Sequence, residues 1–159
     1  MKSMPPGMTW TDDMKRMVLT LLTPTRTLYY EDGDLVTLTT KDGSEGFMAN
    51  HIPTLVEVVP GPLRYRIPGS EGGEEDWRIF FVSVGYAEIQ GDHVTVVVNA
   101  AELPQEIDYE RAREALLRAQ KRLAKEDISE LEQKHARHGI RRAEARLAFY
   151  RRYVESKDL

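Results

Sequence analysis

The spacing of the apolar residues changes once along this chain, within the stretch Asn99–Arg113, which reads NAAELPQEIDYERAR. Before this stretch, short β-branched runs alternate between apolar and polar residues and are separated by turn-forming residues. After it, apolar residues recur every three or four positions, and no further strand-like run follows. Because a period of two is typical of strands and a period near 3.6 is typical of helices, we expect a β-rich part followed by helices.

Short runs that are typical of strands fill the chain from Met17 to Val98. Asp32-Gly33 and Pro60-Gly61 favour tight turns, and Pro24 cannot continue a hydrogen-bonded ladder in a central strand. Many short strands with frequent turns favour an antiparallel β-sandwich or flattened barrel. The expected strands are Met17–Leu22, Arg26–Glu31, Leu35–Thr40, Gly46–Ala49, Leu55–Val59, Leu63–Ile67, Trp77–Val84, Tyr86–Gln90 and His93–Val98.

Two amphipathic helices are expected after this part. Asp108 is a suitable N-cap for the first helix, and Ile107 can pack on Ala112 as a hydrophobic staple. The pattern breaks at Lys125–Asp127, and Gly139 shifts its phase, so the second helix should begin near Gly139 or be kinked there. The apolar faces are Ala112, Ala115, Leu116, Ala119 and Leu123 in the first helix, and Ile140, Ala143, Leu147, Tyr150 and Val154 in the second.

The sequence therefore predicts an α+β chain, with an N-terminal antiparallel β-sandwich followed by a C-terminal α-helical hairpin. We expect the sandwich over residues 17–103, the hairpin over residues 104–159 and a loose N-terminal extension over residues 1–16. The apolar stripes of the two helices are rich in alanine, so the helices can approach each other closely. Few large apolar residues stabilise the hairpin, and we expect it to be the movable half.

Composition and motifs argue against several classes of protein. The chain has no cysteine, which excludes disulfides, thiolate metal sites and a cysteine nucleophile. Phosphate-binding, nucleophile-elbow and zinc-protease motifs are absent from the sequence, and no window approaches a membrane span. The histidines lack metal-ligand spacing; they are His51, His93, His135 and His138. We therefore expect a binding or regulatory protein with no catalytic and no metal residues.

Charge is distributed unevenly along the chain. Residues 102–159 contain 14 Lys and Arg against 12 Asp and Glu, whereas the whole chain has a net charge of −4. The segment Lys134–Arg152 holds seven basic residues and only one acidic residue, Glu144. This segment could be a solvated helix face, a nucleic-acid surface or a docking surface for an acidic protein, to which arginine would pair bidentately.

Three stretches of the sequence together resemble a known family. LLTPTRTLYYEDGDLVTL carries a TP-x-R-x-x-Y pattern, GSEGFMANHIPTLVEVVPGPLRYR carries an N-H-x-P segment, and IDYERA fits an I/L-D-x-x-R-A motif. In this order they resemble the epsilon subunit of the bacterial F-type ATP synthase. Ala49 departs from the proline that many members have, and Lys125–Gly139 reads as a longer linker between the helices. The later arginines of the family, spaced i, i+4, would fall near Phe149 and Tyr153 in an ungapped match.

The resemblance implies a non-catalytic rotor subunit that links the gamma subunit to the membrane c-ring during proton-driven ATP synthesis. It implies a location at the cytoplasmic face of the bacterial cell membrane, with membrane association only through the complex and no contact with nucleic acid. The candidate contacts to gamma and the c-ring are Asn50, His51, Ile52 and Pro53. A basic second helix would meet the beta subunit and inhibit ATP hydrolysis, with the candidate residues Arg137, Arg141, Arg142, Arg146, Arg151 and Arg152.

The IDYERA motif implies in addition that ATP serves as a regulatory ligand, with no required cofactor. Glu102, Ile107, Asp108 and Ala112 would surround the adenine end. Arg111 and Arg118 would reach the phosphates. Two alternatives stay open from the residues alone, namely a free-standing ATP-binding sensor and a nucleic-acid-binding module that uses the basic helix.

Overall fold

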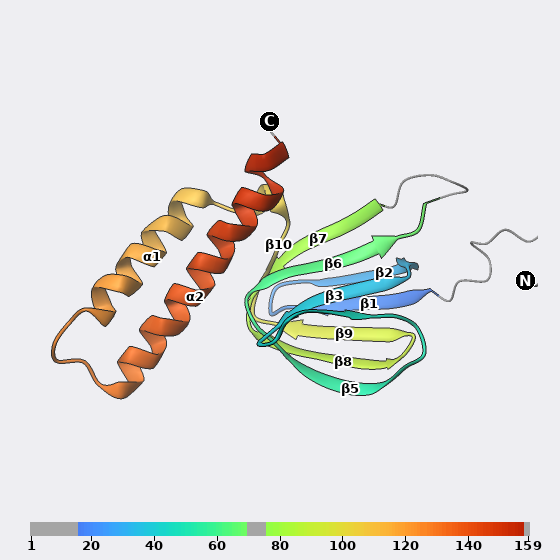
Figure 1. Cartoon of the computed structure of the whole chain (residues 1–159), viewed down its shortest axis with the longest axis horizontal. Coiled ribbons are helices and arrows are strands. Elements are labelled where there is room, and N and C mark those ends of the chain that lie inside the picture. Colours follow the sequence, from blue (N-terminus) through green and yellow to red (C-terminus); the bar gives the residue numbers. More distant parts are fainter. Residues whose placement is uncertain (1–15, 70–75, 158–159) are drawn as a thin grey trace, which may run out of the picture.

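The computed structural model describes residues 16–69 and 76–157. Two stacked β-sheets form one half of the molecule, and two antiparallel helices form the other half (Figure 1). This arrangement confirms the predicted α+β architecture, with the sandwich first and the hairpin second. The extension expected over residues 1–16 lies outside the described residues except for Arg16.

Within the described residues, each sheet contains five strands. The first sheet has the order β2-β1-β9-β8-β5 and the second has the order β10-β7-β6-β3-β4. The bounds of the strands are β1 Met17–Leu22, β2 Thr27–Gly33, β3 Leu35–Thr40, β4 Gly43–Phe47, β5 His51–Val58, β6 Gly61–Ile67, β7 Asp76–Val82, β8 Gly85–Gly91, β9 His93–Val98 and β10 Ala101–Glu102.

The sandwich departs from a purely antiparallel pattern at one pair of strands. β1 runs parallel to β9, with Val18 beside His93 and Leu22 beside Val97. Parallel neighbours need a long connection rather than a tight turn. Here the seven strands between β1 and β9 in the sequence supply that connection, so the prediction of an antiparallel sandwich is correct except at this pair.

Alternating apolar residues of both sheets fill the space between them. Leu19 and Leu21 from β1, and Val94 and Val96 from β9, are fully buried. Tyr65 is also buried, and its hydroxyl donates to the carbonyl of Met17 at 2.8 Å and accepts from the amide of Gly33 at 2.6 Å. The sandwich therefore has its own core, which does not depend on the helices.

Two strand predictions were incomplete. The two-residue strand β10 pairs with β7, with Ala101 beside Val82, and it is too short to produce a visible alternation in the sequence. The segment Asn50–Pro53, which lies between the expected strands Gly46–Ala49 and Leu55–Val59, instead begins β5 at His51. Only Asn50 keeps a turn conformation, with a φ of 67°.

The hairpin consists of α1, Tyr109–Leu123, and α2, Glu130–Tyr153, with short 3₁₀ turns η1 at Pro104–Glu106 and η2 at Glu155–Lys157. The N-cap prediction is confirmed, because the side chain of Asp108 accepts from the amide of Arg111 at 3.0 Å. The expected start of the second helix near Gly139 was wrong. α2 begins nine residues earlier, where Ser129 and Glu132 form a capping box.

Gly139 has a packing role inside α2. A methyl group built at this position would lie 3.4 Å from the Cβ of Ala119 on α1, which is van der Waals contact, so the two helices lie close together here. The shift in apolar phase at Gly139 marks this close contact and not a helix end. The segment Lys125–Gly139, read above as a long linker, is helical from Glu130 onward.

α2 attaches the hairpin to the sandwich (Figure 1). Phe149 is 2% exposed and its ring lies edge-on to Phe81 of β7, at 5.7 Å between centroids. Ile107 and Tyr153 complete this small apolar cluster. The cluster is separate from the main core, so the hairpin can lose these contacts while the sandwich stays folded.

Candidate functional site

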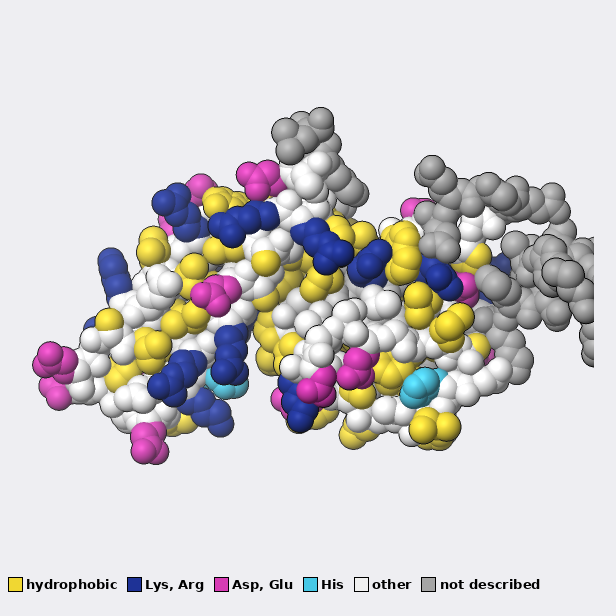
Figure 2. Space-filling model, viewed as in Figure 1, with side chains coloured by type: hydrophobic (Ala, Val, Ile, Leu, Met, Phe, Trp, Pro, Cys, Tyr) yellow, Lys and Arg dark blue, Asp and Glu magenta, His cyan; other side chains and the backbone are white. Residues whose placement is uncertain are grey.

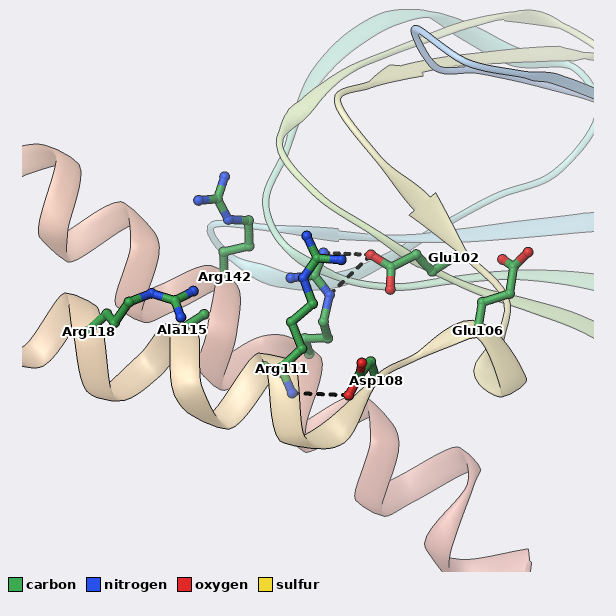
Figure 3. Close-up of a pocket in the computed structure, with 9 residues that line it drawn as sticks. Glu102, Glu106, Asp108, Arg111, Ala115, Arg118 and Arg142 are labelled. Atoms are coloured by element: carbon green, nitrogen blue, oxygen red, sulfur yellow. Dashed lines mark hydrogen bonds and ion pairs between the residues drawn. The ribbon is translucent and has the colours of Figure 1, made fainter.

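A cavity of about 430 Å³ lies where the end of β10, the start of α1 and one face of α2 meet (Figure 3). Glu102 and Glu106 stand on the sandwich side of this cavity, Asp108 caps the start of α1, and the guanidinium groups lie along the helices. The lining residues are Glu102, Glu106, Asp108, Arg111, Ala112, Ala115, Arg118, Arg142 and Arg146.

Helical spacing places the arginines on the walls of the cavity. Arg111 and Arg118 are seven residues apart on α1 and lie on the same side of it (Figure 3). Arg142 and Arg146 are four residues apart and share a face of α2. The small side chains of Ala112 and Ala115 leave room between the two sets of arginines.

Arg146 joins the helices to the sandwich at the edge of this cavity. Its Nη2 and Nε donate to Oε1 of Glu102 at 2.6 and 3.1 Å. The guanidinium also lies 4.8 Å from the ring centroid of Phe81, which adds a cation–π contact. Both side chains of the ion pair are largely buried, with 20% and 25% of their surfaces exposed.

A second ion pair holds the turn η1 on the sandwich. Nη2 of Arg26 lies 2.9 Å from Oε2 of Glu106, and this oxygen also accepts from the amide of Leu103 at 2.7 Å. The hydrogen bond from Arg26 is the main reason why the pKa of Glu106 lies below its usual value. Arg26 therefore holds the turn before α1 on the sandwich, and the amide of Leu103 fixes the Glu106 carboxylate within that turn.

Three arginines of the cavity have no such partner. The side chains of Arg111, Arg118 and Arg142 make no hydrogen bond or ion pair with any residue that the structure describes. Guanidinium groups carry five donors and pair well with phosphate or carboxylate oxygens. The cavity is therefore suited to a ligand with an anionic end near the helices and hydrogen-bond donors near the carboxylates.

The structure brings together five of the six residues that were expected to bind ATP. Glu102, Asp108, Arg111, Ala112 and Arg118 line the cavity, whereas Ile107 is turned away into the apolar cluster with Phe81 and Phe149. Sequence reasoning missed Glu106 and Ala115, and it did not assign Arg142 and Arg146 to this site.

The two positions that an ungapped match aligns with the later arginines of the family do not line the cavity. Phe149 and Tyr153 are buried against the sandwich, whereas Arg142 and Arg146 stand seven residues before them with the same spacing of four. That spacing was visible in the sequence and could have located the pair.

The six arginines proposed for a contact with the beta subunit divide into two groups. Arg142 and Arg146 line the cavity, and Arg142 is exposed at its edge, whereas the other four arginines are exposed and lie outside it: Arg137, Arg141, Arg151 and Arg152. Figure 2 shows basic side chains spread over the visible face of the hairpin. Four of the six therefore lie outside the cavity and are exposed to an outside partner in this arrangement.

The candidate contact segment Asn50–Pro53 lies at the end of the sandwich remote from the hairpin, beside Gly91. Ile52 is 74% exposed, while the ring of His51 packs edge-on against Phe47 at 5.1 Å. Exposed apolar side chains also gather on the outer surface of the first sheet, from adjacent strands: Leu55, Tyr86 and Val97.

Comparison with known protein families identifies the family of this chain. The model for the ATP synthase delta/epsilon chain β-sandwich domain matches residues 16–104, and the model for the long α-helix domain of the same chain matches residues 105–150. This chain belongs to the ATP synthase delta/epsilon family. The predicted resemblance is thereby confirmed.

Curated relatives in the family align with this chain along most of their length. An ATP synthase epsilon chain of Shouchella clausii is 37% identical over 134 residues, which is 84% of this chain and 94% of the relative. An ATP synthase epsilon chain of Ruminiclostridium cellulolyticum is 36% identical over 85% of this chain and 96% of the relative.

Two solved structures share the fold of this epsilon-family chain. One is a chain of the Euglena gracilis mitochondrial ATP synthase, in a structure of OSCP, F1 and c-ring, with a TM-score of 0.68, 23% identity and coverage of 92% of this chain and 89% of that chain. The other comes from the central stalk and c-ring of the Tetrahymena thermophila enzyme, with a TM-score of 0.59, 18% identity and coverage of 86% and 95%.

Two further observations concern the described residues, 16–69 and 76–157. No helix among them has the length and apolar character needed to cross a membrane. No group of three or more His, Asp or Glu side chains among them is arranged to hold a metal ion.

Proposed function

We propose that this chain works as the non-catalytic epsilon subunit of an F-type ATP synthase, as part of the rotor at the cytoplasmic face of the bacterial cell membrane. Membership of the family and the two-part architecture support this proposal. The Euglena and Tetrahymena structures are assemblies that include the c-ring. Membrane association would then come only through the complex.

Two surfaces of the sandwich are suited to the proposed partners. Asn50, His51, Ile52 and Pro53 would face the c-ring from the end of the sandwich, where Ile52 is strongly exposed. The patch of Leu55, Tyr86 and Val97 would pack on gamma, because adjacent exposed apolar side chains on one sheet are typical of a protein interface. Co-purification with gamma should be lost in Tyr86→Asp and retained in Thr25→Asp, which changes an exposed turn residue.

The cavity at the start of α1 is proposed to bind ATP as a regulatory ligand. The observation that carries this proposal is the cluster of four arginines facing three carboxylates across a space of about 430 Å³; three of these arginines have no partner among the described residues. That volume is within the usual range for small-molecule sites. Arg111, Arg118, Arg142 and Arg146 would hold the phosphates, and Glu102, Asp108 and Ala112 would lie near the adenine end.

ATP in this cavity would favour the hairpin in its folded position. The walls come from β10, α1 and α2 together, so the site exists only while the hairpin lies against the sandwich. A ligand that binds one of two conformations shifts the equilibrium toward it by its differential affinity. Because Ala101 and Glu102 pair with β7, the hinge for release would lie at Leu103–Ile107.

A released hairpin is proposed to inhibit ATP hydrolysis. The exposed residues Arg137, Arg141, Arg151 and Arg152 would pair with an acidic surface of the beta subunit, and Arg142 and Arg146 would join them once ATP has left. Truncation after Pro104 should therefore raise hydrolysis by the assembled complex. If the truncated complex hydrolyses ATP at the same rate, the hairpin does not inhibit hydrolysis, and only the proposed rotor role remains.

Calorimetric titration of the full-length protein with ATP tests the ligand directly. Arg111→Ala should abolish or strongly weaken binding, and Arg113→Ala is a matched control, because Arg113 lies on the same helix outside the cavity. Equal binding heats from both variants would show that the arginine cluster does not account for ATP binding. A free-standing sensor would show the same ATP response but would fail to co-purify with gamma.

A further inference from the structure

A groove of about 610 Å³ lies between the hairpin and the end of the first sheet that faces it. Figure 2 shows the open wedge between the lower part of the hairpin and the sandwich. Among the described residues, His138 of α2 is the only one that lines this groove from the hairpin, and the other lining residues belong to the sandwich. The groove therefore has both walls only while the hairpin is docked.

The sandwich wall contains one row of side chains that crosses four neighbouring strands of the first sheet. Residues that pair in register point to the same face of a sheet, and this row lies on the outer face. Tyr86 and Val97 are 58% and 51% exposed, so the middle of the row is apolar and open to a partner. In spatial order the row consists of Leu22 of β1, Val97 of β9, Tyr86 of β8 and Glu57 of β5.

This row continues the surface that is proposed to pack on gamma. Tyr86 and Val97 belong to both the groove and the patch of Leu55, Tyr86 and Val97. Val84, in the turn between β7 and β8, adds another exposed apolar side chain to the groove. Because contiguous exposed apolar residues are typical of one protein interface, a partner that covers the patch reaches the groove without a break.

Two polar side chains stand at the sides of the groove, Glu57 on the sheet and His138 on α2. Both are exposed, and neither makes a hydrogen bond or an ion pair with any residue that the structure describes. A carboxylate accepts hydrogen bonds, and an imidazole can donate or accept them. The groove thus suits a protein segment with apolar side chains for the row, a Lys or Arg for Glu57 and a polar group for His138.

We infer that the part of gamma that packs on this patch continues into the groove and contacts His138 of the docked hairpin. This inference rests on the proposed rotor function and adds a regulatory consequence to it. A partner that touches a wall present in only one of two conformations shifts the equilibrium toward that conformation. Gamma would therefore bind the chain with a docked hairpin more tightly than the chain with a released hairpin, with or without ATP.

The affinity of purified gamma for the full-length protein, measured without nucleotide, tests the contact. His138→Ala should weaken binding by about three- to tenfold, as expected when one contributing side chain is removed from an interface. His135→Ala is the matched control, because His135 is also an exposed histidine of α2 but does not line the groove. It should keep the wild-type affinity, and equal affinities of the two variants would overturn the inference.

Phe149→Ala tests the role of the docked hairpin without changing the groove itself, since Phe149 lies in the apolar cluster that holds α2 on the sandwich. Its affinity for gamma should also fall by about three- to tenfold, because the helix wall is lost. By reciprocity, gamma should slow hydrogen exchange of α2 around His138 in the wild-type protein. An affinity of Phe149→Ala equal to or above that of wild type would overturn the inference.

The same measurements separate this inference from the proposed function. A wild-type protein that does not bind gamma contradicts the rotor role and the inference together. A wild-type protein that binds gamma and loses binding in Tyr86→Asp, but not in His138→Ala or Phe149→Ala, supports the rotor role and contradicts only the contact with the hairpin.

Discussion

Arg146 of α2 and Glu102 of β10 form an ion pair that connects the helical hairpin to the β-sandwich, with Nη2 of the arginine 2.6 Å from Oε1 of the glutamate. The two residues lie 44 positions apart in the sequence. Both also line the proposed nucleotide cavity. The contact that holds the hairpin down is therefore part of the site whose ligand is proposed to control the hairpin.

Replacing Arg146 with alanine should weaken the docking of the hairpin. The change leaves the partly buried carboxylate of Glu102 without its partner and removes the cation–π contact with Phe81. Because about a fifth to a quarter of each side chain is exposed, water will offset part of the loss. We expect about 1–2 kcal/mol of destabilisation, measured by hydrogen exchange of α2.

Arg151→Ala is the control for this measurement, because Arg151 is an exposed arginine of the same helix outside the cavity. It should change the stability of α2 by no more than about 0.5 kcal/mol. The same loss of protection in both variants would show that the Glu102 contact does not hold the hairpin.

Replacing Phe149 with alanine should separate the hairpin from the sandwich. The Phe149 side chain is 2% exposed and lies between Phe81 and Tyr153. Removing a buried aromatic ring typically costs about 3–5 kcal/mol, and this cost falls on the docking cluster and not on the sandwich core. Limited proteolysis should then cut the region from Leu103 onward while the β-sandwich stays intact.

Leu131→Ala provides the comparison, since Leu131 is 62% exposed on α2 and should have little effect on cleavage. Loss of β-sheet structure in Phe149→Ala would contradict the separation of the two apolar clusters.

Local signals predicted the elements of this fold well. Asp108 correctly predicted the start of α1, because a helix cap depends only on residues within one turn. Gly139 was misread as a boundary, because a shift in apolar phase looks the same whether a helix ends or passes close to another helix. β10 was missed because two residues cannot show a period.

The candidate site was only partly predictable, for a related reason. Arg111 and Arg118 belong to one motif and one helix, so their spacing alone places them together. Arg142 and Arg146 meet them only through the register between α1 and α2. That register depends on where α2 begins and on the close approach at Gly139. The ungapped match to the family pattern took no account of this register, and it placed the expected arginines seven residues too late, at Phe149 and Tyr153.

The ion pair between Arg26 and Glu106 should make stability depend on acid pH. The pKa of Glu106 lies below its ordinary value of 4.5 because Arg26 donates hydrogen bonds to the carboxylate. A carboxylate whose pKa is lowered by folding stabilises the protein above its unfolded pKa, and this contribution is lost as the pH falls through the folded pKa. Glu106→Gln should therefore be less stable than wild type at pH 7.

Urea unfolding at pH 7 and at pH 3 measures this effect. The difference between wild type and Glu106→Gln should shrink as the pH falls below 4.5, because protons then bind the carboxyl more readily in the unfolded chain than in the folded one. The effect should be small, because the Glu106 side chain is 41% exposed. A difference that stays constant across this range would show that the ion pair does not contribute.

Arg142→Ala should weaken ATP binding without unfolding the hairpin. Arg142 lines the cavity, and its side chain has no partner among the described residues, so its removal leaves no unpaired carboxylate behind. Loss of one charge-assisted contact to a phosphate is worth about 1.5–3 kcal/mol, or roughly ten- to a hundredfold in affinity.

Arg141 offers a closely matched control for this prediction. It is the neighbouring residue on α2, carries the same charge and lies outside the cavity. Calorimetric titration of Arg141→Ala with ATP should therefore give the wild-type affinity. If both variants bind ATP equally, the charge of α2 as a whole attracts the nucleotide, and the side chain of Arg142 makes no contact with the phosphates. If only Arg142→Ala loses affinity, ATP contacts both helices at once, and nucleotide binding must oppose the release of the hairpin.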